Sequence, residues 1–448
     1  MKIHFLGGVR EVGRSCFLLH EGQSRILLDC GVKLGEKEEH PLLGKNDVHS
    51  LSHAVLSHAH LDHSGYFPAI YGMGYKRDLY LTKPTRDLIQ LLYADYLKLA
   101  GEKGTRPFSE RDVSKLLAST RIVEFEDGGE FARSGIEFFQ SGHILGSSLV
   151  KVNQGGRTLL YSGDVNLRET RLLDGATMGV EAHGLILEST YGSKADRHLS
   201  SKALAQNFVN LVGDSLRKGG KVLVPSFAIG RGQEVLFTLE SFMRSGSLPK
   251  VPIYLDGMVK KALRIYRHNA IYLKREVQRR ILTSDDDPFK SENYRVPEKK
   301  DRSDVLQGGP CVIVATSGML TGGPAMMYLE KLAPGRENAL VLVGYQGEGT
   351  LGRKLLEGAD EIELKGRNVE VRMKVSQAPL SAHSDHDELV KFAKSVKGLE
   401  KVFVVHGEGS KSDELASDIE KQCNRGRPGA HEGKVAAVVP ELGEVLEL

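Results

Sequence analysis

The sequence predicts an α/β protein of two domains, with one domain inserted into the other. At 448 residues the chain is long enough for two domains. Histidines are frequent in both terminal parts of the chain and sparse between them. The part between them repeats an apolar strand, a Gly/Ser-rich loop and a helix, which is the pattern of a parallel sheet.

The first part is expected to consist mainly of short β-strands, because apolar and β-branched runs alternate there with glycine or charge. One helix interrupts them at 85–100, where leucine and tyrosine recur at helical spacing. The expected strands are 2–6, 15–20, 25–29, 53–57, 121–125, 136–140, 147–152, 158–162 and 183–188.

The central part contains the three repeated units. Their strands are expected at 222–224, 312–315 and 339–343, and their helices start at Gln233, Pro324 and Thr350. Loops at the carboxyl ends of parallel strands offer free backbone N–H groups to anions. After about residue 365 the sequence is expected to return to strands, at 369–375, 381–386 and 401–406.

The composition indicates where the protein is located but does not identify its binding partner. The formal net charge is +3, from 61 basic and 58 acidic residues, so bulk charge does not establish a nucleic-acid partner. The four cysteines form no C-x-x-C pair, which favours a reduced, cytoplasmic setting. The N-terminus reads as a strand and not as a signal peptide, and no apolar run has the length of a membrane span.

The densest group of candidate ligands is Ser57-His58-Ala59-His60-Leu61-Asp62-His63, which directly follows an apolar strand. Imidazole nitrogen and carboxylate oxygen suit zinc, and four such ligands in one loop are more than one ion easily uses. The spacing therefore suggests two metals side by side, as in two-metal hydrolases. The alternative is a surface histidine cluster or an incidental metal site.

Five further acids and histidines share one context, the polar end of an apolar strand close to glycine. Each alone is more often structural, but together with the histidine loop they indicate one site. These residues are Asp29, His143, Asp164, Glu188 and His406.

This ensemble resembles the metallo-β-lactamase fold and, within it, the β-CASP nucleases. The resemblance implies an αββα sandwich from residues 1–187 and 366–448, with an inserted β-CASP domain of parallel-sheet α/β type at 188–365. The four metal motifs of the family match at Asp29, the histidine loop, His143 and Asp164. Its three β-CASP motifs match at Glu188, His383 and His406.

The resemblance also implies the ligand sets of two Zn²⁺ ions. One zinc would be held by His58, His60 and His143, and the second by Asp62, His63 and His406. Asp164 would bridge the two ions. Asp29 is expected to orient a histidine or the bridging water without binding metal itself.

The implied reaction is hydrolysis of an RNA backbone to 5′-phosphate and 3′-hydroxyl ends. A water activated by the metals would attack phosphorus, and His383, oriented by Glu188, would protonate the leaving oxygen. Asp62, Glu188 and His383 are therefore the expected catalytic residues. The alternative for His383 is a phosphate contact without proton transfer.

RNA is the expected partner, and two kinds of feature are candidates for holding it. Ser226, Arg231, Ser317 and Thr350, at the strand-to-helix loops, are expected to contact its backbone together with His383. The basic stretch 260–280, with two tyrosines, could track phosphates and stack bases, or it could be a solvated helix face.

The apolar stretches 435–439 and 445–448 could close a homodimer or belong to an internal sheet.

Two other functions stay open from the sequence. One is a small-molecule ester or thioester hydrolase of the same superfamily, and the other is an inactive RNA-binding scaffold. The phosphate-ready loops argue against the first, and the retained ligands argue against the second. Endonuclease and 5′-to-3′ exonuclease activity share one catalytic centre, so the sequence does not separate them.

Overall fold

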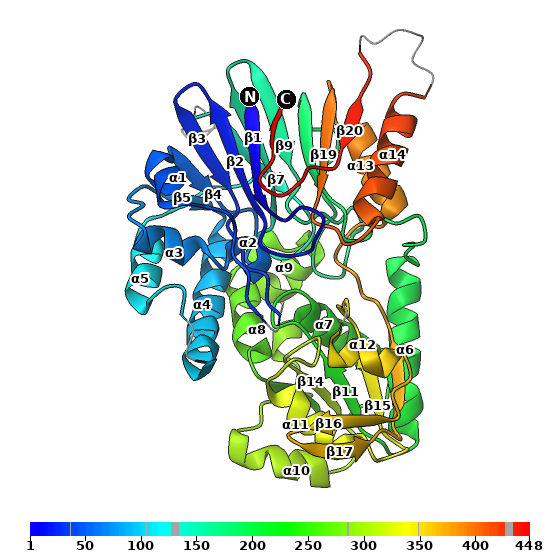
Figure 1. Cartoon of the computed structure of the whole chain (residues 1–448). Coiled ribbons are helices and arrows are strands. Elements are labelled where there is room, and N and C mark those ends of the chain that lie inside the picture. Colours follow the sequence, from blue (N-terminus) through cyan, green and yellow to red (C-terminus); the bar gives the residue numbers. More distant parts are fainter. Residues whose placement is uncertain (36, 104–105, 127–133, 285, 348, 426–432) are drawn as a thin grey trace. The chain divides into compact units, whose positions relative to one another are not determined.

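The chain forms two compact units (Figure 1). The computed structural model describes residues 1–35, 37–103, 106–126, 134–284, 286–347, 349–425 and 433–448. Unit 1 comprises Met1–Arg168, Gly175–His198 and His383–Leu448, and unit 2 comprises Glu169–Asp174 and Leu199–Ala382. Unit 2 thus interrupts unit 1 along the chain. The main boundaries between the units lie at 198/199 and 382/383, whereas the sequence predicted domain boundaries at 187/188 and 365/366.

Unit 1 contains a seven-stranded sheet in the order β21-β1-β2-β3-β4-β5-β6. Strands β21 to β3 pair antiparallel, whereas β3 to β6 pair parallel. The strands are β1 (Lys2–Gly7), β2 (Cys16–Glu21), β3 (Ser24–Leu28), β4 (His53–Val55), β5 (Leu79–Leu81), β6 (Thr120–Ile122) and β21 (Val445–Glu447).

The second sheet of unit 1 has six strands in the order β20-β19-β10-β9-β8-β7. Strands β7, β8 and β9 form an antiparallel meander, and β9, β10, β19 and β20 run parallel. The strands are β7 (Ile136–Gln140), β8 (Ser148–Gln154), β9 (Arg157–Tyr161), β10 (Gly184–Glu188), β19 (Lys401–Val405) and β20 (Ala436–Val438).

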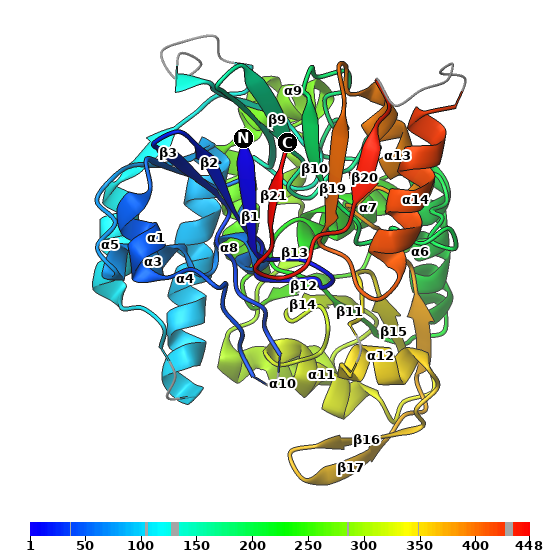
Figure 2. The same ribbon diagram turned by 45° about the horizontal axis from the view of Figure 1, so that its top comes forward.

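The two sheets pack face to face on one apolar core. Phe5 of the first sheet contacts Phe17 and, across the core, Phe403 of the second, with ring centroids 5.8 and 5.5 Å apart. Helices α13 and α14 cover the other face of the six-stranded sheet, while α1, α3, α4 and α5 lie beside the seven-stranded sheet (Figure 2). The αββα sandwich predicted from the sequence is therefore confirmed.

The helices of unit 1 are short apart from α4, whose apolar residues are the clearest helical signal in this part of the sequence. They are α1 (Lys45–Ser50), α2 (Leu61–Ser64), α3 (Phe67–Gly72), α4 (Lys83–Lys103), α5 (Glu110–Ala118), α13 (His386–Ser395) and α14 (Lys411–Cys423).

Unit 2 is built on a six-stranded sheet in the order β13-β12-β14-β11-β15-β18, and every pair in it is parallel. All residues of β11, β14 and β15 are buried, as expected of a parallel sheet with helices on both faces. The strands are β11 (Val222–Pro225), β12 (Ile253–Asp256), β13 (Tyr294–Arg295), β14 (Val312–Ala315), β15 (Ala339–Leu342) and β18 (Lys374–Gln377).

The three repeated units of the sequence correspond to β11–α7, β14–α11 and β15–α12, which confirms the predicted parallel-sheet α/β architecture. A small antiparallel hairpin, β16–β17, is added to it. The remaining elements are α6 (Ser201–Arg217), α7 (Arg231–Arg244), α8 (Val259–His268), η2 (Ala270–Tyr272), α9 (Arg275–Thr283), η3 (Pro288–Lys290), η4 (Lys299–Asp301), α10 (Arg302–Gln307), α11 (Pro324–Leu332), α12 (Leu351–Leu356), β16 (Glu361–Leu364) and β17 (Arg367–Glu370).

Two expected strands are wrong. The stretch 369–375 is divided between β17 and β18, and β18 pairs with β15, so it extends the sheet of unit 2. The stretch 381–386 forms a loop that leads into α13, because Asp385 caps that helix by accepting the N–H of Glu388 at 3.0 Å.

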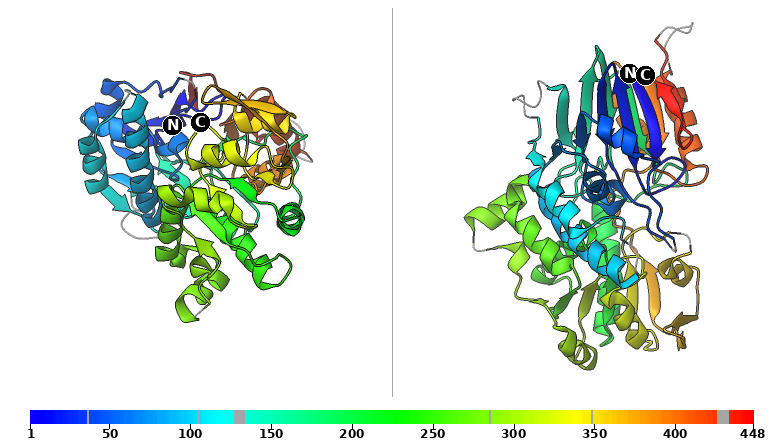
Figure 3. Two further views of the ribbon diagram at one scale, coloured as in Figure 1. Left: turned by 90° about the horizontal axis from the view of Figure 1, so that it is seen from below. Right: turned by 60° about the vertical axis from the view of Figure 1, so that its left-hand side comes forward.

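The two C-terminal apolar stretches pair with the chain's own sheets. Strand β20 pairs with β19, and β21 pairs with β1, and each is the outermost strand of its sheet. Their internal role is thus observed. Among the described residues no helix is long and apolar enough to cross a bilayer. Figure 3 shows the arrangement of these elements from two further directions.

Candidate metal centre

Three parallel strands of unit 1 bring acids and a histidine to one edge of the sheet. Glu188 ends β10, His406 directly follows β19, and Asp164 lies three residues after β9. These strands are neighbours in the order β9-β10-β19, so their carboxyl ends meet. The edge beyond the carboxyl ends of parallel strands is where α/β proteins place their ligands.

The histidine loop is fixed by its own backbone. The three carbonyl groups of 61–63 accept hydrogen bonds at 2.8–2.9 Å from the N–H groups of Val32, Ser15 and Cys30. The approach is so close that a Cβ placed on Gly31 would lie 1.8 Å from the Asp62 carbonyl oxygen. Glycine is therefore needed at 31 for space, and the side chains of the loop are presented from a rigid backbone.

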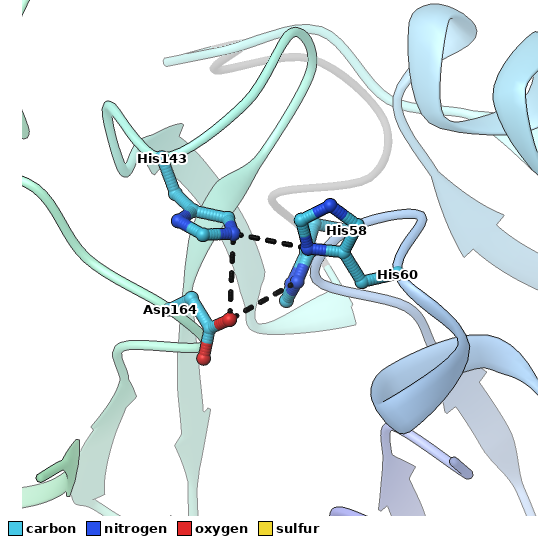
Figure 4. Close-up of side chains that lie close together, drawn as sticks. All are labelled: His58, His60, His143 and Asp164. Atoms are coloured by element: carbon cyan, nitrogen blue, oxygen red, sulfur yellow. Dashed lines mark hydrogen bonds and ion pairs between the residues drawn. The ribbon is translucent and has the colours of Figure 1, made fainter. Parts of the chain in front are cut away.

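The first group of candidate ligands consists of His58, His60, His143 and Asp164 (Figure 4). One nitrogen or oxygen from each lies within 4.8 Å of the others. His143 Nε2 is 3.1 Å from His60 Nδ1 and 3.4 Å from Asp164 Oδ2, and His58 Nε2 is 3.4 Å from the same oxygen. The four side chains converge on one point, as ligands of a single ion would.

The second group consists of Asp62, His63 and His406, which also meet within 4.8 Å. His63 Nε2 and His406 Nδ1 lie 3.2 and 3.4 Å from Asp164 Oδ1, and His406 Nε2 is 3.6 Å from Asp62 Oδ2. The two oxygens of Asp164 thus face different groups of histidines, an arrangement that suits a bridging carboxylate.

Several polar atoms in these groups are buried and make no hydrogen bond within the described part of the chain. They are the Nε2 atoms of His58, His60, His63 and His406 and the Oδ1 atom of Asp164. Burying polar atoms without partners costs free energy, so their number at one place needs an explanation. Nitrogen and oxygen donors in this number fit zinc.

Asp29 orients His63 of the second group. Its Oδ2 accepts hydrogen bonds from His63 Nδ1 at 2.7 Å, Tyr161 Oη at 2.6 Å and Ser57 Oγ at 2.6 Å, and its Oδ1 accepts the Ser57 N–H at 2.7 Å. Because the proton of His63 lies on Nδ1, its Nε2 lone pair points toward Asp164. A carboxylate that fixes the tautomer of a ligating histidine is a recurrent feature of zinc sites.

Ser57 does the same for His58. Its hydroxyl donates to Asp29, so it accepts from His58 Nδ1 at 3.1 Å and leaves Nε2 free of a proton. Burial lowers the pKa of His58 and lowers that of His60 to about 3. Both imidazoles are therefore neutral at neutral pH, which is the form that binds metal.

The acids of the site are held ionised. Burial raises the pKa of Asp164, but the nearby His63 and His406 outweigh it and the pKa falls well below its usual value. For His63 burial lowers the pKa, but Asp164 and Asp29 outweigh it, so the pKa is raised. The Asp164 carboxylate is therefore ionised, which is the form that binds metal.

His383 lies at the rim of the cluster, where it contacts Glu188. Its Nδ1 donates to the two carboxylate oxygens of Glu188 at 2.9 and 3.0 Å, and its ring centroid is 4.6 Å from that of His143. Glu188 is buried and also accepts the Val165 N–H at 2.8 Å. The Ser384 N–H donates to the Val165 carbonyl at 2.8 Å, which ties the His383 loop to the loop of Asp164.

Sequence reasoning missed three residues of this site. Tyr161 donates to Asp29, but on a buried strand it reads as core. Arg168 donates to the His383 carbonyl at 3.1 Å. His198 has a buried Nε2 with no hydrogen bond among the described residues, and its ring lies 4.7 Å from that of Tyr191, which also neighbours His383. Tertiary contacts alone reveal these roles.

The four predicted phosphate contacts belong to unit 2. Arg231 opens α7, and Thr350 caps α12 by accepting the Arg353 N–H at 3.3 Å. Ser317 lies between β14 and α11, and its hydroxyl accepts the N–H of residue 321 at 2.9 Å. Ser226 is fully buried, and both its hydroxyl and its backbone N–H donate within the protein, so its surroundings give the predicted contact no support.

Comparisons with known proteins agree with this geometry. Residues 18–205 match the metallo-beta-lactamase superfamily domain, and 232–355 match the Beta-Casp domain. Residues 368–426 match the Zn-dependent metallo-hydrolase RNA specificity domain. A protein of unknown function from Enterococcus faecalis V583 has the same fold, with a TM-score of 0.60 and 14% identity over 100% of this chain and 99% of that one.

Sequence relatives cover nearly the whole chain. Transcription termination factor FttA of Lokiarchaeum sp. (strain GC14_75) is 36% identical over 441 residues, 95% of this chain and 69% of that protein. The RNase J-like protein of Methanocaldococcus jannaschii is 35% identical over 453 residues, 100% of this chain and 99% of that one. The chain belongs to the β-CASP family of the metallo-β-lactamase superfamily. This β-CASP protein binds metal and is a metal-dependent ribonuclease.

Proposed function

We propose that the β-CASP protein holds two zinc ions in unit 1 and uses them to hydrolyse RNA phosphodiester bonds to 5′-phosphate and 3′-hydroxyl products. One ion would be bound by His58, His60 and His143, and the other by Asp62, His63 and His406, with Asp164 shared. The observation that carries the proposal is the division of the Asp164 carboxylate, whose two oxygens face the two groups. Bound zinc would supply Lewis acidity and lower the pKa of a water to near 7.

The remaining chemistry falls to residues of the chain. We propose that His383 donates a proton from Nε2 to the leaving 3′ oxygen, because its Nδ1 proton is engaged by Glu188. Glu188 fixes the ring and would stabilise the imidazolium form. If His383 only contacts phosphate, replacement by glutamine would preserve most of the rate.

The proposed contacts to the RNA backbone are loop residues of unit 2. Arg231, Ser317 and Thr350 are proposed contacts to its backbone, and Ser226 remains a prediction. A homodimer formed at the outer strands β20 or β21 is also a prediction, which sedimentation of the full chain would test.

The test uses zinc-loaded protein with a circular RNA and a linear 5′-monophosphate RNA of the same sequence. Asp62→Ala is the control, and zinc content is measured in both proteins. Loss of the linear RNA alone, with release of mononucleotides, would establish a 5′-end-dependent exonuclease. Cutting of the circle would establish an endonuclease.

Three results would contradict the proposal. If both RNAs survive although the wild-type protein carries zinc, a small-molecule hydrolase becomes the better explanation. If the protein binds RNA but holds no zinc, it is a scaffold. Equal cleavage by Asp62→Ala would trace the activity to a contaminant.

A further inference from the structure

The positive charge of the chain is concentrated in one short stretch of unit 2. The 25 residues from the start of α8 to the end of α9, 259–283, contain eight lysines and arginines and one acid, Glu276. The rest of the chain has 53 basic and 57 acidic residues, a formal net charge of −4. The mild overall charge of +3 therefore hides a segregated basic surface.

Helix α8 divides into an apolar and a basic face. Val259, Ala262, Leu263 and Tyr266 are buried, at the spacing of one helical face. Tyr266 is 1% exposed, so the sequence-based idea that it stacks bases is wrong. The other face carries exposed cationic side chains that recur about every 6 Å along the axis.

We define the α8–α9 patch as Lys260, Lys261, Arg264, Arg275 and Arg279. All are exposed except Lys260, which is half-buried. None has an ion pair or side-chain hydrogen bond with any residue that the structure describes. Helices α8 and α9 are labelled in Figure 1, and along the chain η2 lies between them.

The neighbouring acids are occupied by other cations of the same stretch. Asp287 pairs with Arg267 at 2.6 Å, Asp286 with Arg280 at 3.0 Å, and Glu169 with Lys274 at 2.6 Å. These pairs engage three acids next to the α8–α9 patch, and Glu276 of α9 is the one acid within the stretch 259–283.

The patch weakens its own helices. Like charges four residues apart, as at Lys260 with Arg264 and at Arg275 with Arg279, each cost about 0.2–0.5 kcal/mol. Lys260, Lys261 and Arg275 also lie in the first turns of α8 and α9, where the helix dipole disfavours cations. A solvated face would gain from mixed charges, whereas a polyanion beside the patch would relieve this repulsion.

We propose that the α8–α9 patch binds the phosphate backbone of single-stranded RNA as a site additional to the metal centre. The choice of RNA as the polyanion rests on the proposed function, because RNA is the substrate of a ribonuclease. The patch consists of lysines and arginines alone, so the contact is electrostatic and does not read sequence. Its contribution grows with RNA length and falls with salt.

The test compares two variants in an Asp62→Ala background, which prevents cleavage. The patch variant carries Lys261→Gln, Arg264→Gln, Arg275→Gln and Arg279→Gln. The matched control removes four exposed lysines that also make no ion pair in the described structure: Lys45→Gln, Lys76→Gln, Lys202→Gln and Lys218→Gln. Circular dichroism and thermal unfolding confirm that both variants fold.

The measurement is the Kd for a 30-nucleotide single-stranded RNA as a function of KCl concentration. Each phosphate contact contributes about 0.7 to the slope of log Kd against log salt. The patch variant is expected to lose about 3 from that slope and to bind at least tenfold more weakly at 0.1 M KCl. The control variant should keep the wild-type slope.

Equal slopes for wild type and patch variant would overturn the inference and favour an acidic protein as the partner of this face. Equal losses in both variants would also overturn it, because they would show a bulk charge effect. A reduced slope in the patch variant of a protein that cleaves no RNA would retain the patch and reject the proposed function. If the wild-type protein cleaves RNA but the patch variant shows no change in slope, the proposed function is retained and the patch is rejected.

Discussion

Asp29→Asn is expected to weaken zinc binding although Asp29 is not a proposed ligand. Asp29 accepts four hydrogen bonds, one of them from His63 Nδ1 at 2.7 Å. An asparagine in the same position has one acceptor oxygen and one amide donor, so at least one of these donors loses its acceptor. His63 would then lose the charge that fixes its tautomer and raises the basicity of Nε2.

The expected size follows from this contact. Removing the partner of a ligating histidine weakens metal binding about 10- to 100-fold, or about 1.4–2.7 kcal/mol. The effect should fall on the ion of Asp62, His63 and His406 and spare the other. Competition of the zinc-loaded protein with a chelator of known affinity would resolve one weakened and one unchanged site.

Tyr161→Phe is the matched control, because it removes one donor to Asp29 but keeps the carboxylate beside His63. Its zinc affinity should fall less than tenfold. If Asp29→Asn retains both ions with wild-type affinity, Asp29 does not orient His63 for metal. If both affinities fall equally, the substitution has disturbed the whole loop.

Two further predictions address the backbone and the pH response. Gly31→Ala should lower the unfolding temperature and release zinc, because its Cβ would lie 1.8 Å from the Asp62 carbonyl oxygen. Gly309→Ala is the control, because no atom lies within 4 Å of a Cβ placed there. Equal unfolding temperatures and zinc contents of the two variants would contradict the argument. In metal-free protein, burial lowers the pKa of His60 to about 3, so unfolding takes up a proton below pH 6.5 and stability falls as pH drops. Between pH 7 and 5 the burial of His60 should lower the free energy of unfolding by about 2 kcal/mol. Urea unfolding of His60→Gln should show a decline with pH that is smaller by this amount. An unchanged decline in the variant would show that His60 is not shielded from solvent in the folded state.

The repeated units and the ligands were predictable because each is a local signal. An apolar run followed by a polar residue and glycine identifies a strand end, and the parallel order then brings Asp164, Glu188 and His406 together. The αββα sandwich followed from the family motifs, because the alternation of residues within a strand does not determine which sheets pack against each other.

Other features depend on contacts between distant residues. Tyr161 reads as a core residue, and only the fold brings its hydroxyl to Asp29. The stretch 381–386 has the composition of a strand, although Asp385 and Glu388 form a capping box. The sequence assigns β18 to the wrong part because pairing with β15, and not composition, decides its sheet.

The order of the strands also sets when the metal centre is completed during synthesis. β19 carries His406 and pairs with β10, whose residues are made more than two hundred positions earlier. Until the ribosome has released β19 and His406, the second group lacks one of its three members, and α14, which follows β19, is still missing from the sheet. A nascent chain would therefore expose the histidine loop without a complete pair of metal sites. A ribonuclease with this topology stays inactive until most of its own message has been translated.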